Sequence, residues 1–174
     1  VVIEKGEPKS CNIVTSCEGK GKTFIMFSDD LDKALATFVL ANGAAATGQK
    51  VTIFFTFWGL NVIKKLHKPN VEKDIFGKMF GMMLPSSSRK LKLSKMSMGG
   101  IGGKMMRYIM NRKGIDSLES LRQQALENGV EFIACQMSMD VMGVKQEELL
   151  DEVTIGGVAT YMERADNANI NLFI

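Results

Sequence analysis

The chain has 174 residues, of which 45% are hydrophobic and 24% are charged, and its formal net charge is +3. This length and composition are ordinary for a globular protein with one sizeable core. No apolar run reaches the roughly 18–20 residues of a membrane span, and the N-terminal residues are polar and charged, unlike an export signal. We therefore expect a cytoplasmic protein and do not expect membrane contact.

The predicted elements alternate between strands and helices. In chain order they are a buried strand (22–28), a helix capped by Ser28 or Asp29 and closed by Gly48, a buried strand (50–59), a helix capped by Ser117 (117–129), a strand (130–135), a helix running into a short strand near 153–155 (145–153), a helix (156–168) and a last strand (170–174). Such alternation is typical of helices packed on a mostly parallel sheet. The sequence predicts a three-layer α/β sandwich with a mostly parallel five-stranded sheet.

The segment 70–114 does not fit the alternation. It contains ten Lys or Arg and two Asp or Glu, a balance of +8, against −5 for the rest of the chain. Residues 74–114 also hold eight of the thirteen methionines, and "GGIGG" (99–103) predicts a flexible stretch. Because connections in compact α/β domains are usually about 2–6 residues long, we interpret 70–114 as an insertion in one domain spanning 23–174.

The role of this Met- and Lys-rich insertion stays open. Methionine-rich patches adapt to varied surfaces, so the insertion can pack on its own domain or a neighbouring subunit, dock a partner protein, or meet an anionic interface. A lid or a docking surface beside the active edge of the sheet is one hypothesis. We expect no nucleic-acid partner, because only Phe76, Phe80 and Tyr108 offer stacking in this segment.

The three cysteines cannot all pair within the chain, which favours a reducing compartment. Cys11 and Cys17 have five residues between them, not the two of C-x-x-C, and the single histidine, His67, cannot complete a usual zinc set. We expect no metal site, and His67 is interpreted as a surface residue. Residues 1–22 lack periodicity and are interpreted as a flexible arm.

Several polar loops follow the carboxyl ends of the predicted strands. Ligands of open parallel sheets bind beyond these ends, so we expect the loops to converge. The candidates are Ser28, Asp29 and Asp30 after the first strand, Trp58 and Gly59 after the second, Cys135 with Gln136, Met137, Ser138 and Asp140 after the third, and Gly156 with Gly157, a small anion nest or a tight turn. Phosphate-loop and dinucleotide motifs are missing, since "SDDLDK" occupies the first turn.

Cys135 is the candidate nucleophile among these loops. A thiol gains reactivity near a helix N-terminus, and "SMDVM" after Cys135 predicts a short helix, with Asp140 opposing the effect if it points inward. A buried structural thiol remains the alternative at this point, because cysteine is among the most buried residue types.

Two stretches resemble a known family. "FSDDLDKALATFVLANGAAATGQKVTIFFTFWGLNVIKK" (27–65) and "FIACQMSMDVMGVKQEEL" (132–149) are similar to the DsrE/DsrF-like sulfur-relay family, in the branch associated with rhodanese and TusA-like domains. The resemblance implies a flavodoxin-like α/β domain that forms trimers or hexamers and needs no cofactor. It further implies a persulfide on Cys135, with Gln136, Met137, Ser138 and Asp140 shaping its pocket, and sulfur exchange with rhodanese-like or TusA-like proteins.

The leading interpretation is thus an intracellular sulfur carrier or sulfurtransferase acting through Cys135, whether or not it counts as an enzyme. One alternative is a non-catalytic oligomeric subunit in which Cys135 is inert. Another is a small-ligand or nucleotide binder that uses the loops at the edge of the sheet.

Overall fold

The computed structural model describes residues 21–66, 85, 87–95 and 100–174. Its elements are β1 (Gly21–Met26), α1 (Leu31–Ala46), β2 (Val51–Phe55), the 3-10 helices η1 (Phe57–Ile63) and η2 (Ser88–Lys90), α3 (Ile101–Arg112), α4 (Leu118–Glu127), β3 (Glu131–Cys135), α5 (Gln136–Met142), the 3-10 helix η4 (Gln146–Glu148), β4 (Thr154–Gly156), α6 (Val158–Asp166) and β5 (Ala168–Phe173). Cys11, Cys17, His67 and the predicted arm up to residue 20 lie outside the described residues.

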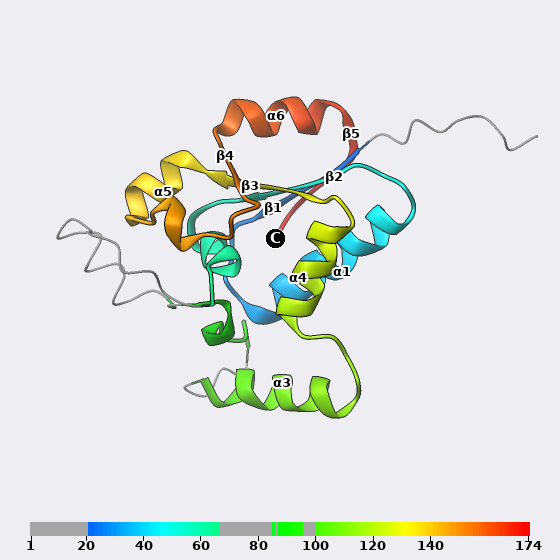
Figure 1. Cartoon of the computed structure of the whole chain (residues 1–174), viewed down its shortest axis with the longest axis vertical. Coiled ribbons are helices and arrows are strands. Elements are labelled where there is room, and N and C mark those ends of the chain that lie inside the picture. Colours follow the sequence, from blue (N-terminus) through cyan, green and yellow to red (C-terminus); the bar gives the residue numbers. More distant parts are fainter. Residues whose placement is uncertain (1–20, 67–84, 86, 96–99) are drawn as a thin grey trace, which may run out of the picture.

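The five strands form one sheet in the order β4-β3-β2-β1-β5, and every neighbouring pair is parallel. Helices α1 and α4 cover one face and α6 covers the other (Figure 1). The chain advances from β1 to β4 in one direction and then returns to place β5 beside β1. Because crossovers between parallel strands are right-handed, this reversal puts α6 on the opposite face from α1 and α4. The predicted α/β sandwich with a five-stranded parallel sheet is confirmed.

The larger core lies between the sheet and the α1–α4 layer. Phe38 of α1 meets Phe132 of β3 at a ring-centroid distance of 5.7 Å, and Phe55 of β2 meets Phe132 at 5.4 Å. All three rings are fully or almost fully buried. Burying a side chain of this size contributes about 1.5–3 kcal/mol to the free energy of folding. Because the central strands are covered on both faces, their sequences are continuous apolar runs.

The second strand is shorter than the sequence predicts. β2 ends at Phe55, and Phe57 has φ 46°, a left-handed conformation that begins η1. The turn brings Gly59 so close to β1 that its N–H donates to Phe27 O at 2.8 Å. A Cβ on Gly59 would lie 2.0 Å from Met26 O. The prediction of a strand through residue 59 is wrong because this close approach of two chain segments overrides the local preference for strand.

The prediction of a helix at 145–153 is also wrong. This segment forms only the short η4, and then Leu149 makes an antiparallel bridge with Lys64. Lys65 N donates to Glu148 O at 2.8 Å, and Leu150 N donates to Ile63 O at 3.1 Å. These backbone bonds to the end of η1 hold the segment extended.

The helix caps follow the sequence in one case and not in the other. Ser117 caps α4 as predicted, and its Oγ accepts from the Ser120 N–H at 3.1 Å. The N-cap of α1 is Asp30 instead of Ser28 or Asp29, and its side chain makes no capping bond. The Ser28 Oγ accepts from the Asp30 N–H and donates to the Asp30 carboxylate, so this pair organises the turn before the helix.

The described part of the insertion contains one long helix. "GGIGG" was predicted to be flexible, but Gly102 and Gly103 lie buried in α3. A Cβ on Gly103 would meet Leu91 O at 3.2 Å, so the missing side chain allows α3 to pack closely. Helix α3 lies beyond α1 and α4, on the side of the molecule away from α6 (Figure 1). In the described part of the chain, no helix is long and apolar enough to cross a membrane.

Candidate functional site

The predicted loops lie along one edge of the sheet. They follow the carboxyl ends of β1, β2, β3 and β4, which are parallel and adjacent in the sheet (Figure 1). Cys135 is the last residue of β3 and stands in register with Gly156 of β4. The convergence expected from the sequence is therefore present, with Cys135 between the ends of β2 and β4.

Cys135 lies where the chain changes sides. After β3 the chain enters α5, which packs against η1 and contributes Met139 and Met142 to the core on the α1–α4 face. After β4 the chain enters α6 on the opposite face (Figure 1). Such a divergence of neighbouring connections opens the crevice in which α/β proteins bind ligands. In this sheet the divergence is between β3 and β4.

The Cys135 side chain faces the α6 layer. Alternate residues of a strand point to opposite faces, and Cys135 clusters with Ile133 of β3, Phe54 of β2 and Tyr161 of α6. The residue is 1% exposed. The predicted short helix is confirmed as α5, with Cys135 as its N-cap residue, but the sulfur makes no capping hydrogen bond. Access to the thiol in this conformation is closed.

Of the two glycines at the end of β4, Gly156 serves the packing around this thiol. A Cβ on Gly156 would lie 2.8 Å from Ile133 Cγ2 and 3.3 Å from Thr160 Cβ. Glycine at this position lets β4 and the beginning of α6 close on β3. Gly157 is the N-cap residue of α6, and a Cβ there would meet no atom within 4 Å.

The four residues expected to shape the pocket divide between two sides of α5. Ser138 is buried, and its hydroxyl lies 2.8 Å from the Thr56 hydroxyl at the end of β2. Gln136 donates to the Asp140 carboxylate at 2.9 Å on the exposed side, so Asp140 does not point inward. Met137 is 54% exposed. Of these four residues, only Ser138 is buried.

The acidic loop after β1 forms its own network. The Asp29 carboxylate accepts from the Asn61 amide at 3.0 Å, and Asp30 pairs with Lys33 at 2.9 Å. Burial raises the pKa of Asp29, helped by the charge of Asp30 and opposed by the Asn61 hydrogen bond and by Lys64. Asn61 is fully buried, and its Oδ1 has no hydrogen-bond partner among the described residues. A single polar residue within the apolar stretch "GLNVI" is the sequence signal that could have identified Asn61.

The residues after β2 connect the ends of two strands. Gly59 donates to Phe27 O and packs against Met26, as described above, whereas Trp58 is 42% exposed. The ring of Phe57 lies 5.4 Å from that of Phe27. Gly59 thus has a structural role, and Trp58 lies on the surface at the same edge of the sheet.

Three residues on the α6 side of the sheet were not identified from the sequence. Tyr161 of α6 is buried, with its ring 5.2 Å from that of Phe54 and its hydroxyl 3.3 Å from the Thr23 hydroxyl. Arg164 of α6 donates to both oxygens of the Glu131 carboxylate, at 3.0 and 3.2 Å. This bond, together with a smaller one from Thr52, lowers the pKa of Glu131 against the effect of burial. No short-range motif signals such contacts between distant segments.

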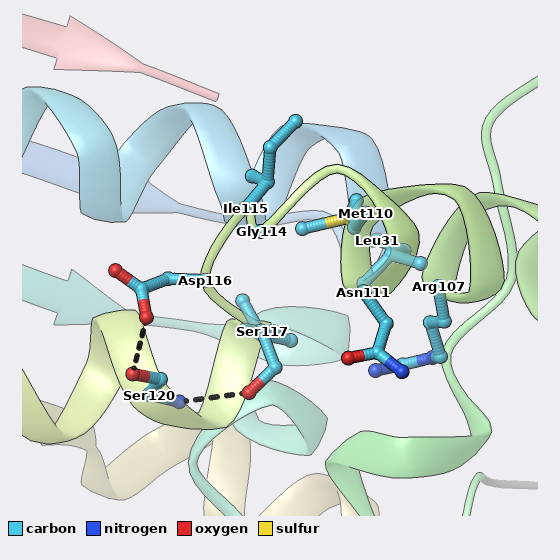
Figure 2. A pocket seen from close by; sticks show the side chains of 10 residues that line it. Leu31, Arg107, Met110, Asn111, Gly114, Ile115, Asp116, Ser117 and Ser120 are labelled. Atoms are coloured by element: carbon cyan, nitrogen blue, oxygen red, sulfur yellow. Dashed lines mark hydrogen bonds between the residues drawn. The ribbon is translucent and has the colours of Figure 1, made fainter.

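A pocket of about 400 Å³ lies away from Cys135, between α3, the loop after it and the first turns of α1 and α4. Figure 2 shows the side chains of Arg107 and Asn111 among those that line it. Arg107 also donates to Ser88 O at 3.0 Å and lies 3.5 Å from the Glu119 carboxylate. None of the predicted site residues lines this pocket. Among the described residues, no group of three or more His, Cys, Asp or Glu is arranged to hold a metal.

Comparison with known proteins gives consistent matches. The model of the DsrE/DsrF/DrsH-like family matches residues 19–173. The uncharacterized protein YrkE of Bacillus subtilis is 44% identical over 155 residues, 89% of this chain and 97% of that protein. The sulfur carrier protein DsrE2 of Allochromatium vinosum is 38% identical over 161 residues, 90% of this chain and 99% of that protein.

The fold is also found in a solved structure. The crystal structure of the ychN protein from E. coli superposes with a TM-score of 0.53 at 11% identity, covering 88% of this chain and 99% of that one. The association with rhodanese and TusA-like domains stays a prediction. The match over residues 19–173 confirms the resemblance seen in the sequence, and the chain belongs to the DsrE/DsrF/DrsH-like family.

Proposed function

We propose that this protein is a sulfur carrier that holds sulfane sulfur as a persulfide on Cys135 and passes it between partner proteins. The observation that carries the proposal is the position of Cys135 at the carboxyl end of a central parallel strand, next to the divergence of β3 and β4. The identity of 38% to a sulfur carrier protein supports the same role.

The chemistry needs one thiol and no cofactor. The Cys135 thiolate attacks the outer sulfur of a donor persulfide, a new S–S bond forms on Cys135, and the donor leaves as a thiolate. An acceptor thiolate then attacks the outer sulfur of the Cys135 persulfide, and Cys135 leaves as a thiolate. Each transfer breaks one S–S bond and forms another, so no external oxidant or reductant is consumed.

The proposal includes the setting of this exchange. The partners are proteins that carry reactive thiols, of rhodanese-like or TusA-like type, and the carrier works as a homo-oligomer in the cytoplasm, where thiols stay reduced. Gln136, Met137 and Asp140 on the exposed side of α5 lie beside Cys135 in the chain and are available to a partner.

The test is sulfur loading followed by mass spectrometry of the intact protein and its peptides. After incubation with a persulfide donor, the peptide containing Cys135 should gain about 32 Da, the mass of one sulfur atom. Cys135→Ser should lose this gain, whereas the control Cys17→Ser should keep it on the Cys135 peptide. The proposal is wrong if Cys135 in the parent protein takes up no sulfur under conditions in which the donor loads a free thiol.

A second candidate function is supported by the burial of the thiol. At 1% exposure Cys135 can be an inert part of the core, and the protein can then act as a non-catalytic subunit of an assembly. In that case Cys135 resists both sulfur loading and alkylation in the native protein, and Cys135→Ser leaves its assembly unchanged.

A further inference from the structure

The face of the sheet that carries the Cys135 thiol is covered by a single helix of the described chain. Three members of the buried cluster around the thiol, Phe54, Ile133 and Cys135 itself, belong to the sheet, and the fourth, Tyr161, belongs to α6. The Tyr161 ring packs on Phe54, and its hydroxyl lies beside that of Thr23. Removal of α6 would therefore open this cluster to solvent.

Helix α6 packs on the sheet with few buried side chains. Tyr161 is its one buried residue, and Val158 and Met162 are 58% and 49% exposed. Further attachments are the partly buried Ala165, which packs against the same cluster, and the bidentate pair of Arg164 with Glu131, supported by the bond from Thr52 to the same carboxylate. The helix begins directly after Gly156 and Gly157. Segments with few buried contacts are those that open locally without unfolding the whole domain.

We infer that α6 is a cover over the Cys135 thiol, in which Tyr161 seals the thiol from the solvent and the Arg164–Glu131 pair acts as the latch. In the closed state small thiols and oxidants do not reach the sulfur. In the open state α6 tilts away from the sheet, and Cys135 becomes available for attack. These three residues thereby determine what reacts with Cys135.

This inference deepens the proposed function, since a covered persulfide is protected from free thiols until α6 is displaced. Its test does not depend on that function, because alkylation reads the access to the thiol with no sulfur donor present. A failure of sulfur loading and a failure of the cover are thus separate results.

The experiment measures the rate at which iodoacetamide alkylates Cys135 in the native full chain, with peptide mass spectrometry separating Cys135 from Cys11 and Cys17. When closing is faster than alkylation, the rate is proportional to the open fraction. Arg164→Gln removes the bidentate pair from a partly exposed site, so we expect alkylation about two- to fivefold faster than in the parent. Arg164→Lys keeps the charge but cannot make the bidentate pair, so its alkylation rate should lie between those of the parent and Arg164→Gln.

The matched control is Ser117→Ala, which removes the cap of α4 on the opposite face and lowers global stability without touching α6. Its alkylation rate should stay that of the parent. If Ser117→Ala and Arg164→Gln accelerate alkylation in proportion to their loss of global stability, the thiol reacts only through global unfolding and there is no cover. An unchanged rate in Arg164→Gln, or a parent rate equal to that of the denatured chain, would also overturn the inference.

Discussion

The hydroxyl pair of Thr56 and Ser138 gives the sharpest prediction for stability. Thr56 is 8% exposed and Ser138 is 0% exposed, and their oxygens lie 2.8 Å apart. The pair joins the end of β2 to α5, directly after Cys135. Replacing one partner leaves the other hydroxyl buried without its hydrogen bond, whereas replacing both removes the unpaired group as well.

The expected magnitude follows from this difference. Ser138→Ala or Thr56→Val alone should lower the free energy of unfolding by about 1–3 kcal/mol, the cost of an unsatisfied buried polar group. For a domain of this size each kcal/mol corresponds to roughly 2–4 °C in Tm, so the single variants should melt roughly 2–12 °C below the parent. The double variant should cost less than the sum of the singles, with a coupling energy of about 1 kcal/mol.

The assay is urea unfolding followed by circular dichroism, in which the midpoint falls while the slope m stays constant. Thr154→Val, an exposed threonine on β4, is the control and should change stability by less than about 0.5 kcal/mol. Additive losses in the double variant, or single losses no larger than that of the control, would refute the reasoning.

Two further predictions concern Gly59 and Glu131. Gly59→Ala places a Cβ 2.0 Å from Met26 O and should abolish or severely weaken folding, whereas Gly43→Ala in α1, where a Cβ meets no atom within 4 Å, should raise stability by about 0.5–1 kcal/mol; soluble yield and Tm compare the two. The hydrogen bond from Arg164 holds the pKa of Glu131 below its ordinary value of 4.5, so the stability from this carboxylate is present above about pH 4.5 and is lost as the pH falls through the lowered value. The difference in unfolding free energy between the parent and Glu131→Gln should therefore shrink below pH 4.5. A difference that stays constant from about pH 3 to about pH 7 would contradict this prediction.

The sequence predicted those elements whose signals are local. Helix α4 begins and ends where Ser117 and Gly129 indicate, and β1 and β3 fall on their apolar runs. The end of β2 and the segment after Val144 were mispredicted because their conformations depend on contacts with distant chain segments. Gly59 must fit against β1, and the segment near Leu149 must bridge to Lys64.

The same division applies to the candidate site. The position of Cys135 at the end of a strand follows from its own neighbourhood in the sequence, and so does the short helix after it. Its burial does not, because the covering residue Tyr161 belongs to another element, as does Arg164, the partner of Glu131. Gln136 and Asp140 bond to each other on the exposed side of α5, and their expected role in shaping a pocket stays a prediction.

The helices that follow β3 and β4, α5 and α6, are attached to the domain by different contacts. This difference bears on how sulfur would reach Cys135. On one side, α5 is fixed to the large core through Met139 and Met142 and through the Ser138–Thr56 pair. On the other side, α6 buries Tyr161, packs Ala165 against the same cluster and pairs Arg164 with Glu131. Both follow from the divergence of the chain after β3 and β4, which places α5 and α6 on opposite faces of the sheet. Because the Cys135 side chain lies on the face that α6 covers, the proposed transfer of sulfur requires a displacement on the α6 side.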